Sequence, residues 1–205
     1  MHINLGFSNV EKILHVADVH IRNYKRHKEY RQVFRKLYKA AKALPENSII
    51  YLAGDIVHTK TDISPELVSI VSEFFNKLAN IRPTVVIAGN HDANLNNPSR
   101  LDALTPIVEN LNNDNLYYLR DSGIYTFADV DFIVYSILEE SSTWPNPKQS
   151  SSKNKIGLFH GAVNNSKTDA GYTVRDENLP LKTFDGCHMV MLGDIHKYQY
   201  LNSNE

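Results

Sequence analysis

This sequence has very little cysteine, no long apolar run and almost no net charge. Cys187 is the single cysteine among 205 residues, which excludes an intrachain disulfide and suits a protein of the reducing cytoplasm. No apolar run approaches the roughly 20 residues that span a bilayer, and the first residues lack the charged and apolar blocks of a secretory signal. We therefore expect no membrane association. The formal net charge of -1 argues against nucleic-acid binding driven by overall charge.

The basic residues are unevenly distributed despite this neutral balance. Nine of the 22 Lys and Arg residues fall within residues 22–42, where Glu29 is the one acidic residue. Five of the nine share the face of a predicted helix that lies opposite its apolar residues: Lys28, Arg31, Arg35, Lys39 and Lys42. Such a face is ordinarily a solvated surface, and its functional alternative is a surface that follows phosphates.

The first 92 residues alternate between buried-strand patterns and amphipathic-helix patterns. Pro45 ends the first helix, and Ser64-Pro65 predicts the start of the second, because an N-cap precedes a proline at the first helical position. The predicted strands cover residues 12–17, 48–53 and 83–88, and the predicted helices cover residues 30–44 and 65–78. The order β-α-β-α-β implies a parallel sheet with right-handed crossovers.

The second half of the chain has a different texture. A third helix is predicted over residues 100–111, and short β-rich runs separated by turn residues then predict an antiparallel meander. Residues 139–155 are rich in Ser, Pro and Asn without periodicity, so we expect a mobile surface loop there. The runs of the meander cover residues 116–119, 124–127 and 132–137, and further strands are predicted at residues 155–159 and 188–192.

Five of the predicted strands end in polar motifs. In chain order the motifs are Asp18-Val19-His20, Gly54-Asp55, Gly89-Asn90-His91-Asp92, His160-Gly161 and Gly193-Asp194-Ile195-His196. Strand ends are where open α/β sheets bind ligands, and carboxylate, amide and imidazole groups are ligands for divalent metals. Residues i and i+2 of an extended segment point to one side, so Asp18 and His20 can reach one ion. A polar turn explains any one motif, but five in succession predict a two-metal hydrolase of phosphate esters.

The order of these motifs resembles that of the calcineurin-like metallophosphoesterase superfamily. The phrases GDIVHTK after the second strand and LFHGAVNNSK around His160 are most similar to the nuclease branch, the nuclease subunits of double-strand-break repair complexes. The resemblance implies an α/β fold with four layers, an α-β-β-α sandwich. It also implies a DNA substrate, an SMC-like coiled-coil ATPase as partner and a homodimer. A viral or bacterial origin suits so compact a member.

The resemblance also sets an expectation for how much of the sandwich is present. Residues 1–205 are expected to form one metallophosphoesterase domain. Compared with the nuclease relatives, we expect this domain to lack its last strands, the DNA-capping domain and the ATPase-docking region.

Carried over by position, the resemblance implies a role for each polar residue. The first metal would be held by Asp18, His20 and His196, the second by Asn90 and His160, and Asp55 would bridge both. His91 would protonate or stabilise the leaving oxygen, and Asp92 would orient its ring. His58 would contact the DNA phosphate, with a plain loop histidine as the equal alternative.

Asp194 departs from the family pattern. The usual final motif is G-H-x-H, in which the first histidine is a ligand of the second metal, and Asp194 stands at that position. A carboxylate favours harder ions, so we expect Mn²⁺, with Mg²⁺ or Fe²⁺ as alternatives. We predict that Asp194 is a ligand; the alternative is that it contacts a ligand and leaves the second site weaker.

The residues and the resemblance together imply a reaction. Two divalent ions about 3.5–4 Å apart would activate a bridging hydroxide for in-line attack on phosphorus. We expect metal-dependent phosphodiester hydrolysis, with DNA in repair or recombination as the favoured substrate. The alternatives are hydrolysis of small phosphomonoesters, cyclic nucleotides or phosphoproteins, and a non-catalytic scaffold that keeps the fold.

Overall fold

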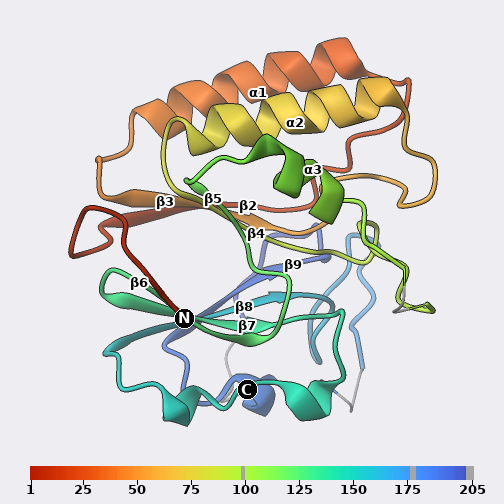
Figure 1. The fold of residues 1–205 in the computed structure, drawn as a ribbon. Helices are drawn as coiled ribbons and strands as arrows, with labels where there is room; N and C mark the ends of the chain where they lie inside the picture. The colour runs from red at the N-terminus through yellow and green to blue at the C-terminus, as the bar shows by residue number, and fades with distance from the viewer. Residues whose placement is uncertain (98–99, 176–178, 202–205) are drawn as a thin grey trace.

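The computed structural model describes residues 1–97, 100–175 and 179–201, which form two facing β-sheets (Figure 1). The first sheet is entirely parallel, with the order β2-β3-β4-β5, and the second has the order β1-β6-β7-β8-β9. The strands are β1 (His2–Ile3), β2 (Lys12–Val16), β3 (Ser48–Ala53), β4 (Thr84–Ile87), β5 (Leu116–Tyr118), β6 (Gly123–Phe127), β7 (Val130–Tyr135), β8 (Asn154–His160) and β9 (Met189–Gly193).

Helices cover the outer face of each sheet. The first sheet lies beneath α1 (His27–Lys42), α2 (Pro65–Ala79) and α3 (Thr105–Leu111) in Figure 1. Among the described residues, the second sheet is covered by three short 3-10 helices, η1 (Ser141–Thr143), η2 (Pro147–Gln149) and η3 (Leu181–Phe184). The predicted α/β sandwich is therefore confirmed. No helix in the described part of the chain is long and apolar enough to cross a membrane.

Strand β3 shows why the central strands have unbroken apolar sequences. Ile50 and Leu52 point into the core beneath the helices, whereas Ile49, Tyr51 and Ala53 point into the core between the two sheets. All five side chains are fully buried. A strand with a hydrophobic layer on each face has no solvent side on which polar residues can alternate.

The start of α2 confirms the helix signal in the sequence. Ser64 is the N-cap, and its Oγ accepts a hydrogen bond from the Leu67 amide at 3.2 Å. Pro65 occupies the first helical position, where its missing N–H is not needed.

The third helix is shorter than the sequence pattern predicts. It begins at Thr105 rather than at residue 100, because Asp102 Oδ1 accepts hydrogen bonds from the amides of Leu104 and Thr105 at 2.9 and 2.7 Å. Pro106 then lies in the first turn. An acidic side chain that accepts hydrogen bonds from these amides marks the start of a helix. The apolar residues upstream of Asp102 led us to place that start too early.

Of the two pairings in the predicted antiparallel meander, one is confirmed and one is wrong. β5 pairs in parallel with β4 and completes the first sheet, so the chain crosses to the second sheet after β5. β6 and β7 form an antiparallel hairpin, but β7 then pairs in parallel with β8, and β8 with β9. A short apolar run predicts a strand without indicating its partner, because packing against the opposing layer decides the pairing.

Residues 139–155 contain more local structure than the irregular loop that we predicted. They include η1, η2 and the beginning of β8. Trp144 Nε1 donates a hydrogen bond to the Ser136 carbonyl at 3.0 Å, and its ring packs edge-on against Tyr135 and Phe159. The contacts of Trp144 hold this segment against the second sheet despite its polar composition. The mobility of this segment stays a prediction.

Candidate metal centre

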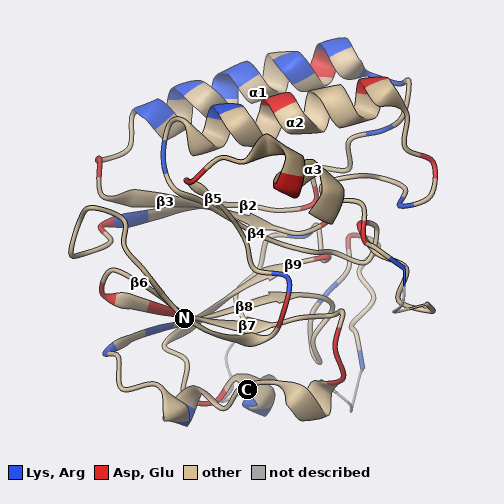
Figure 2. Ribbon diagram, viewed as in Figure 1, with Lys and Arg blue, Asp and Glu red and all other residues tan. Residues whose placement is uncertain are grey.

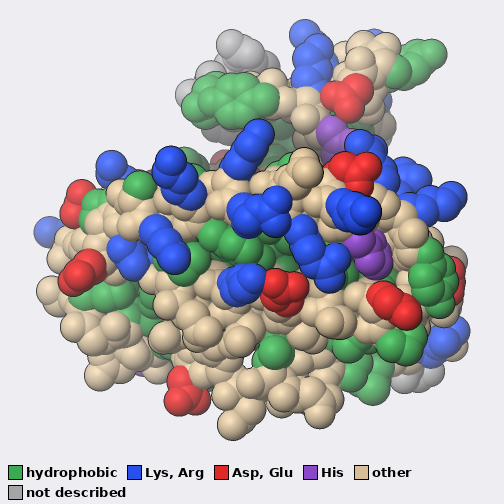
Figure 3. Space-filling model, turned by 90° about the horizontal axis from the view of Figure 1, so that it is seen from above, with side chains coloured by type: hydrophobic (Ala, Val, Ile, Leu, Met, Phe, Trp, Pro, Cys, Tyr) green, Lys and Arg blue, Asp and Glu red, His purple; other side chains and the backbone are tan. Residues whose placement is uncertain are grey.

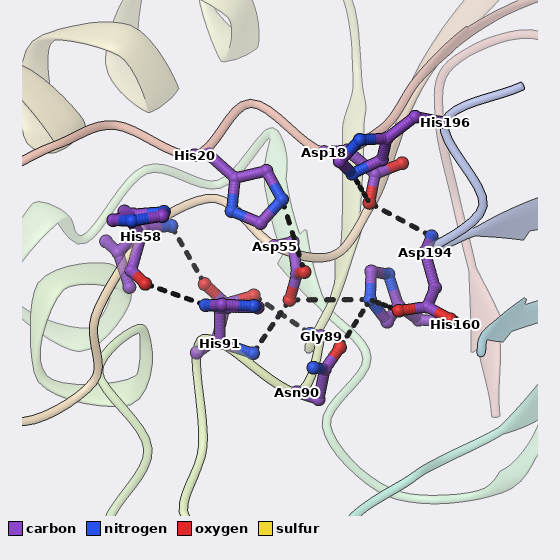
Figure 4. A network of polar contacts seen from close by, with 12 residues as sticks. Asp18, His20, Asp55, His58, Gly89, Asn90, His91, His160, Asp194 and His196 are labelled. Carbon is purple, nitrogen blue, oxygen red and sulfur yellow. Dashed lines mark hydrogen bonds and ion pairs between the residues drawn. The ribbon is translucent and has the colours of Figure 1, made fainter. Parts of the chain in front are cut away.

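The polar motifs meet at one edge of the sandwich, where strands of both sheets end (Figure 4). Strands β2, β3 and β4 position residues from the first sheet, and β8 and β9 position residues from the second. The side chains that lie together there are those of Asp18, His20, Asp55, His58, Asn90, His91, His160, Asp194 and His196. The convergence that the sequence pattern predicted is therefore present, although the residues are up to about 180 positions apart.

Four of these residues have a left-handed backbone conformation. The angle φ is 54° at Asp18, 46° at His20, 50° at Asp55 and 85° at Asp194. Non-glycine residues in this region are strained, and such strain concentrates at functional sites. The segment that carries Asp18 and His20 is not extended, so the predicted i, i+2 geometry is wrong. Asp18 and His20 nevertheless face the same group of ligand atoms.

Backbone hydrogen bonds hold the motif loops against one another. The Asp18 amide donates to the Gly54 carbonyl at 3.2 Å, and the His20 amide donates to the Asp55 carbonyl at 2.9 Å. The His91 amide donates to Asp55 Oδ1 at 2.8 Å. The loops after β2, β3 and β4 are therefore connected around Asp55.

The glycines of these motifs allow this close approach. A Cβ on Gly89 would collide with the backbone amide and carboxylate of Asp55. Gly54 has a φ of 80°, which glycine adopts without a steric penalty. Side chains at these two positions would push the loops after β3 and β4 apart and displace Asp55.

Asp55 lies between two groups of possible metal ligands. Its Oδ2 is 3.5 Å from His20 Nε2, and its Oδ1 is 3.4 Å from His160 Nε2. Burial opposes ionisation of this carboxyl, but hydrogen bonds from His160 and from the His91 amide hold its pKa below the ordinary value. Two oxygens that face different donor groups are what a bridging ligand requires.

The first donor group consists of Asp18, His20 and His196. Their ligand atoms all lie within 4.8 Å of one another, and His196 Nε2 is 3.8 Å from Asp18 Oδ1. The His196 side chain is half exposed, so this group opens to solvent. These are the three residues expected to hold the first metal, and that role stays a prediction.

The second donor group surrounds His160. Its Nε2 is 3.0 Å from Asn90 Oδ1 and 4.0 Å from Asp194 Oδ1. Its Nδ1 donates a hydrogen bond to the Ala53 carbonyl at 2.6 Å, which leaves Nε2 as the ring nitrogen that faces the site. Asp194 thus lies where the sequence analysis expected a ligand of the second metal.

The chemistry of these donors fits divalent cations. Three carboxylates, those of Asp18, Asp55 and Asp194, face one another across the two groups. Burial raises the pKa of Asp194, and nearby Asp55 and Asp18 add to that effect, whereas the charge of His160 opposes it. Bound cations would compensate this crowding of negative charge. Oxygen and imidazole donors suit Mn²⁺, Mg²⁺ or Fe²⁺, and the choice among them stays a prediction.

The predicted orientation of His91 by Asp92 is wrong. Asp92 is fully buried, and its two oxygens accept hydrogen bonds from the amides of Val57 and Gly89, each at 2.9 Å. Burial raises the pKa of Asp92 to about 7. The carboxylate therefore ties together the loops after β3 and β4. The ring of His91 is oriented by another group, because its Nδ1 donates to the His58 carbonyl at 2.7 Å.

His58 lies against the two other histidines on its side of the site. Its ring is nearly parallel to that of His91, with centroids 5.6 Å apart, and edge-on to that of His20 at 5.5 Å. Burial lowers the pKa of His58, and the positive charge of Arg22 lowers it further. His58 is therefore part of the site, and its contact with a DNA phosphate stays a prediction.

The sequence analysis missed two residues at the border of the site. Lys60 Nζ donates a hydrogen bond to the Asn90 carbonyl at 3.0 Å and steadies the loop after β4. Asp169 Oδ2 lies 3.9 Å from His196 Nδ1. Lys60 belongs to the GDIVHTK phrase, so the sequence offered a reason to consider it. Asp169 does not follow a predicted strand, and only the tertiary structure brings it near His196.

Strands of two sheets that end in carboxylate and imidazole groups around a shared aspartate form the kind of site expected of a metal-dependent phosphoesterase. Residues 11–198 match the sequence profile of the calcineurin-like phosphoesterases, and the chain belongs to this family. The family is one of metal-dependent phosphoester hydrolases, and the His and Asp groups of the site could hold the divalent ions that the family implies.

The comparison with curated proteins adds a viral relative. The chain is 45% identical over 210 residues to an uncharacterized protein of Acanthamoeba polyphaga mimivirus. The matched region is 97% of this chain and 16% of the relative, so the chain spans a small part of that protein's length.

Proposed function

We propose that this chain hydrolyses phosphodiester bonds in DNA, as a nuclease of repair or recombination that uses Mn²⁺. The observation that carries the proposal is the position of His91 beside the donor groups. Its ring centroid lies 4.8 Å from that of His20, and its ring is stacked with that of His58 at 5.6 Å. An imidazole beside the candidate metal ligands, and not itself assigned as a ligand, offers the leaving oxygen of a phosphodiester a proton source.

When divalent ions are bound by these residues, they polarise the phosphate and lower the pKa of a bound water. His91 can supply a proton to the leaving oxygen. Its Nδ1–H is already bonded to the His58 carbonyl, so a doubly protonated ring has Nε2–H left for the leaving oxygen. The ring can neutralise the charge that develops as the P–O bond breaks. No covalent intermediate with the protein is required.

The test compares three substrates for the purified chain: DNA, a bis-aryl phosphodiester and an aryl phosphomonoester. We expect Mn²⁺-dependent cleavage of DNA and of the diester, much slower hydrolysis of the monoester, and loss of all turnover on chelation. A His91→Ala protein purified in the same way controls for contaminating nucleases.

Two results would contradict the proposal. Faster turnover of the phosphomonoester than of either diester would favour a small-molecule phosphatase. Binding of two ions without turnover of any substrate would favour a non-catalytic scaffold.

We also propose an SMC-like coiled-coil ATPase as partner and a homodimer, on the resemblance of the GDIVHTK and LFHGAVNNSK phrases. Sedimentation velocity over a range of protein concentrations tests the dimer, and a single monomeric species at every concentration would contradict it.

A further inference from the structure

The outer face of α1 carries a long row of positive charge. Figure 2 shows Lys and Arg along this helix, and Figure 3 shows basic side chains spread over the upper face of the molecule. Every basic residue of segment 22–42 is exposed. We call these residues the basic row: Arg22, Lys25, Arg26, Lys28, Arg31, Arg35, Lys36, Lys39 and Lys42.

Carboxylates neutralise little of this charge. Within the described part of the chain, Arg31 is the one member of the basic row with a carboxylate partner within 4.0 Å, Glu73 at 3.7 Å. Glu73 also pairs with Lys77 on its own helix. The whole chain has a net charge of -1, so the basic row is a local concentration rather than part of a general excess. Such a surface attracts polyanions.

The basic row begins next to the metal centre. Tyr30 Oη donates a hydrogen bond to the His20 carbonyl at 2.5 Å, which fastens the first turn of α1 to the loop that carries the donors. Arg22 is close enough to lower the pKa of His58, after the larger effect of burial. Arg22 therefore brings positive charge next to the histidines of the site, and the basic row continues from there onto α1.

The members of the row on α1 are spaced for a linear polyanion. From Lys28 to Lys42 the residues of one face recur every three or four positions and extend over about 21 Å at 1.5 Å per residue. Phosphates along one strand of a B-form duplex follow one another about every 3.4 Å of axis, so this length corresponds to roughly six phosphates.

We propose that the backbone of duplex DNA binds along the outer face of α1, with the metal centre at the N-terminal end of that helix; this rests on the proposed nuclease function. The face offers charge without stacking platforms. Tyr30 and Tyr38 of α1 pack toward the core, and the exposed ring of Tyr24 lies before the helix. Proteins that bind single strands add exposed aromatic rings to a basic groove, whereas phosphate contacts alone suit a duplex.

The experiment measures binding of a fluorescent 20-base-pair duplex by anisotropy, over a series of salt concentrations and with chelator present to prevent cleavage. The test variant carries Lys28→Gln, Arg35→Gln and Lys39→Gln, because glutamine keeps a high helix propensity. We expect its affinity at 0.1 M salt to fall at least roughly tenfold, and its slope of log K against log salt to become shallower by about 2 to 3.

The matched control carries Lys148→Gln, Lys153→Gln and Lys182→Gln, which remove the same charge from exposed positions on the side of the second sheet. Circular dichroism and thermal unfolding verify that both variants are folded. An equal loss of affinity in both variants, or an unchanged salt slope in the α1 variant, would overturn the proposal. Tighter binding of a single strand than of the duplex would overturn the choice of ligand.

Failure of this inference and failure of the nuclease proposal give different results. Duplex binding that depends on α1, in a protein that cleaves no DNA when Mn²⁺ is supplied, would refute the nuclease proposal and leave a duplex-binding surface. If the wild type cleaves DNA and the α1 substitutions leave the duplex affinity unchanged, this inference alone would be refuted.

Discussion

The backbone carbonyl of His58 accepts a hydrogen bond from Nδ1 of His91, so the ring proposed to act on the leaving oxygen is oriented by a main-chain atom. A substitution of the His58 side chain leaves that carbonyl in place. The contribution of the His58 ring can therefore be separated from its role in positioning His91.

We expect His91→Ala to lower kcat for a bis-aryl phosphodiester by a factor of about 10²–10⁴, the usual contribution of a general acid. His58→Ala should lower it by less than about tenfold on the same substrate, because the carbonyl continues to orient His91. Steady-state kinetics measure both, with calorimetric titration of Mn²⁺ to verify metal binding. Equal losses in the two variants would contradict the assignment, as would a loss of metal binding in His91→Ala.

Asp194 should hold one of two bound ions. The carboxylate lies 4.0 Å from His160 Nε2, within the second donor group. We expect Asp194→Ala to reduce the Mn²⁺ stoichiometry from two ions to one, as measured by elemental analysis after equilibrium dialysis. Asp169→Ala is the control, because Asp169 is exposed and lies 3.9 Å from His196 Nδ1, outside the second donor group. Two ions retained at full affinity in Asp194→Ala would mean that this carboxylate is not a ligand.

Gly89→Ala should disrupt the site although it replaces none of the candidate metal ligands. The added methyl group would collide with the Asp55 carboxylate that separates the two donor groups. We expect loss of Mn²⁺ binding at one or both positions, measured by the same dialysis. Gly123→Ala is the control, because Gly123 in β6 has no left-handed backbone and the atoms nearest to a Cβ there belong to the Tyr125 side chain, at 3.2 Å. Unchanged metal binding in Gly89→Ala would show that the loops after β3 and β4 separate at little cost.

Asp92 should contribute to stability rather than to the orientation of His91. Its two oxygens accept the amides of Val57 and Gly89 in a fully buried position. Asp92→Asn turns one acceptor into a donor that faces an amide, which should lower the free energy of unfolding by about 1–3 kcal/mol. Urea titration measures this loss, with the exposed Asp121→Asn as control. A fall in kcat at unchanged stability would instead support a role in positioning His91.

The positions of the site residues along the chain could be predicted because each strand end has a local signature. The unbroken apolar run of β3 followed by Gly54-Asp55 shows both the strand and its end, and the same holds for β4 and its glycine. Parallel order then brings these ends to one edge. The pairing of β5 could not be predicted, because a three-residue strand has no preference of its own between two sheets.

Local sequence therefore determined most of the strands, the first two helices and the strand ends that carry the candidate ligands, since hydrophobic periodicity, capping and glycine placement act over a few neighbouring positions. Tertiary structure decided which atoms face one another. It placed Asp18 and His20 in a left-handed backbone, gave the orientation of His91 to a carbonyl of His58, and turned Asp92 toward two amides. Main-chain atoms are the same in every residue, so contacts made by them leave no mark in an amino-acid sequence.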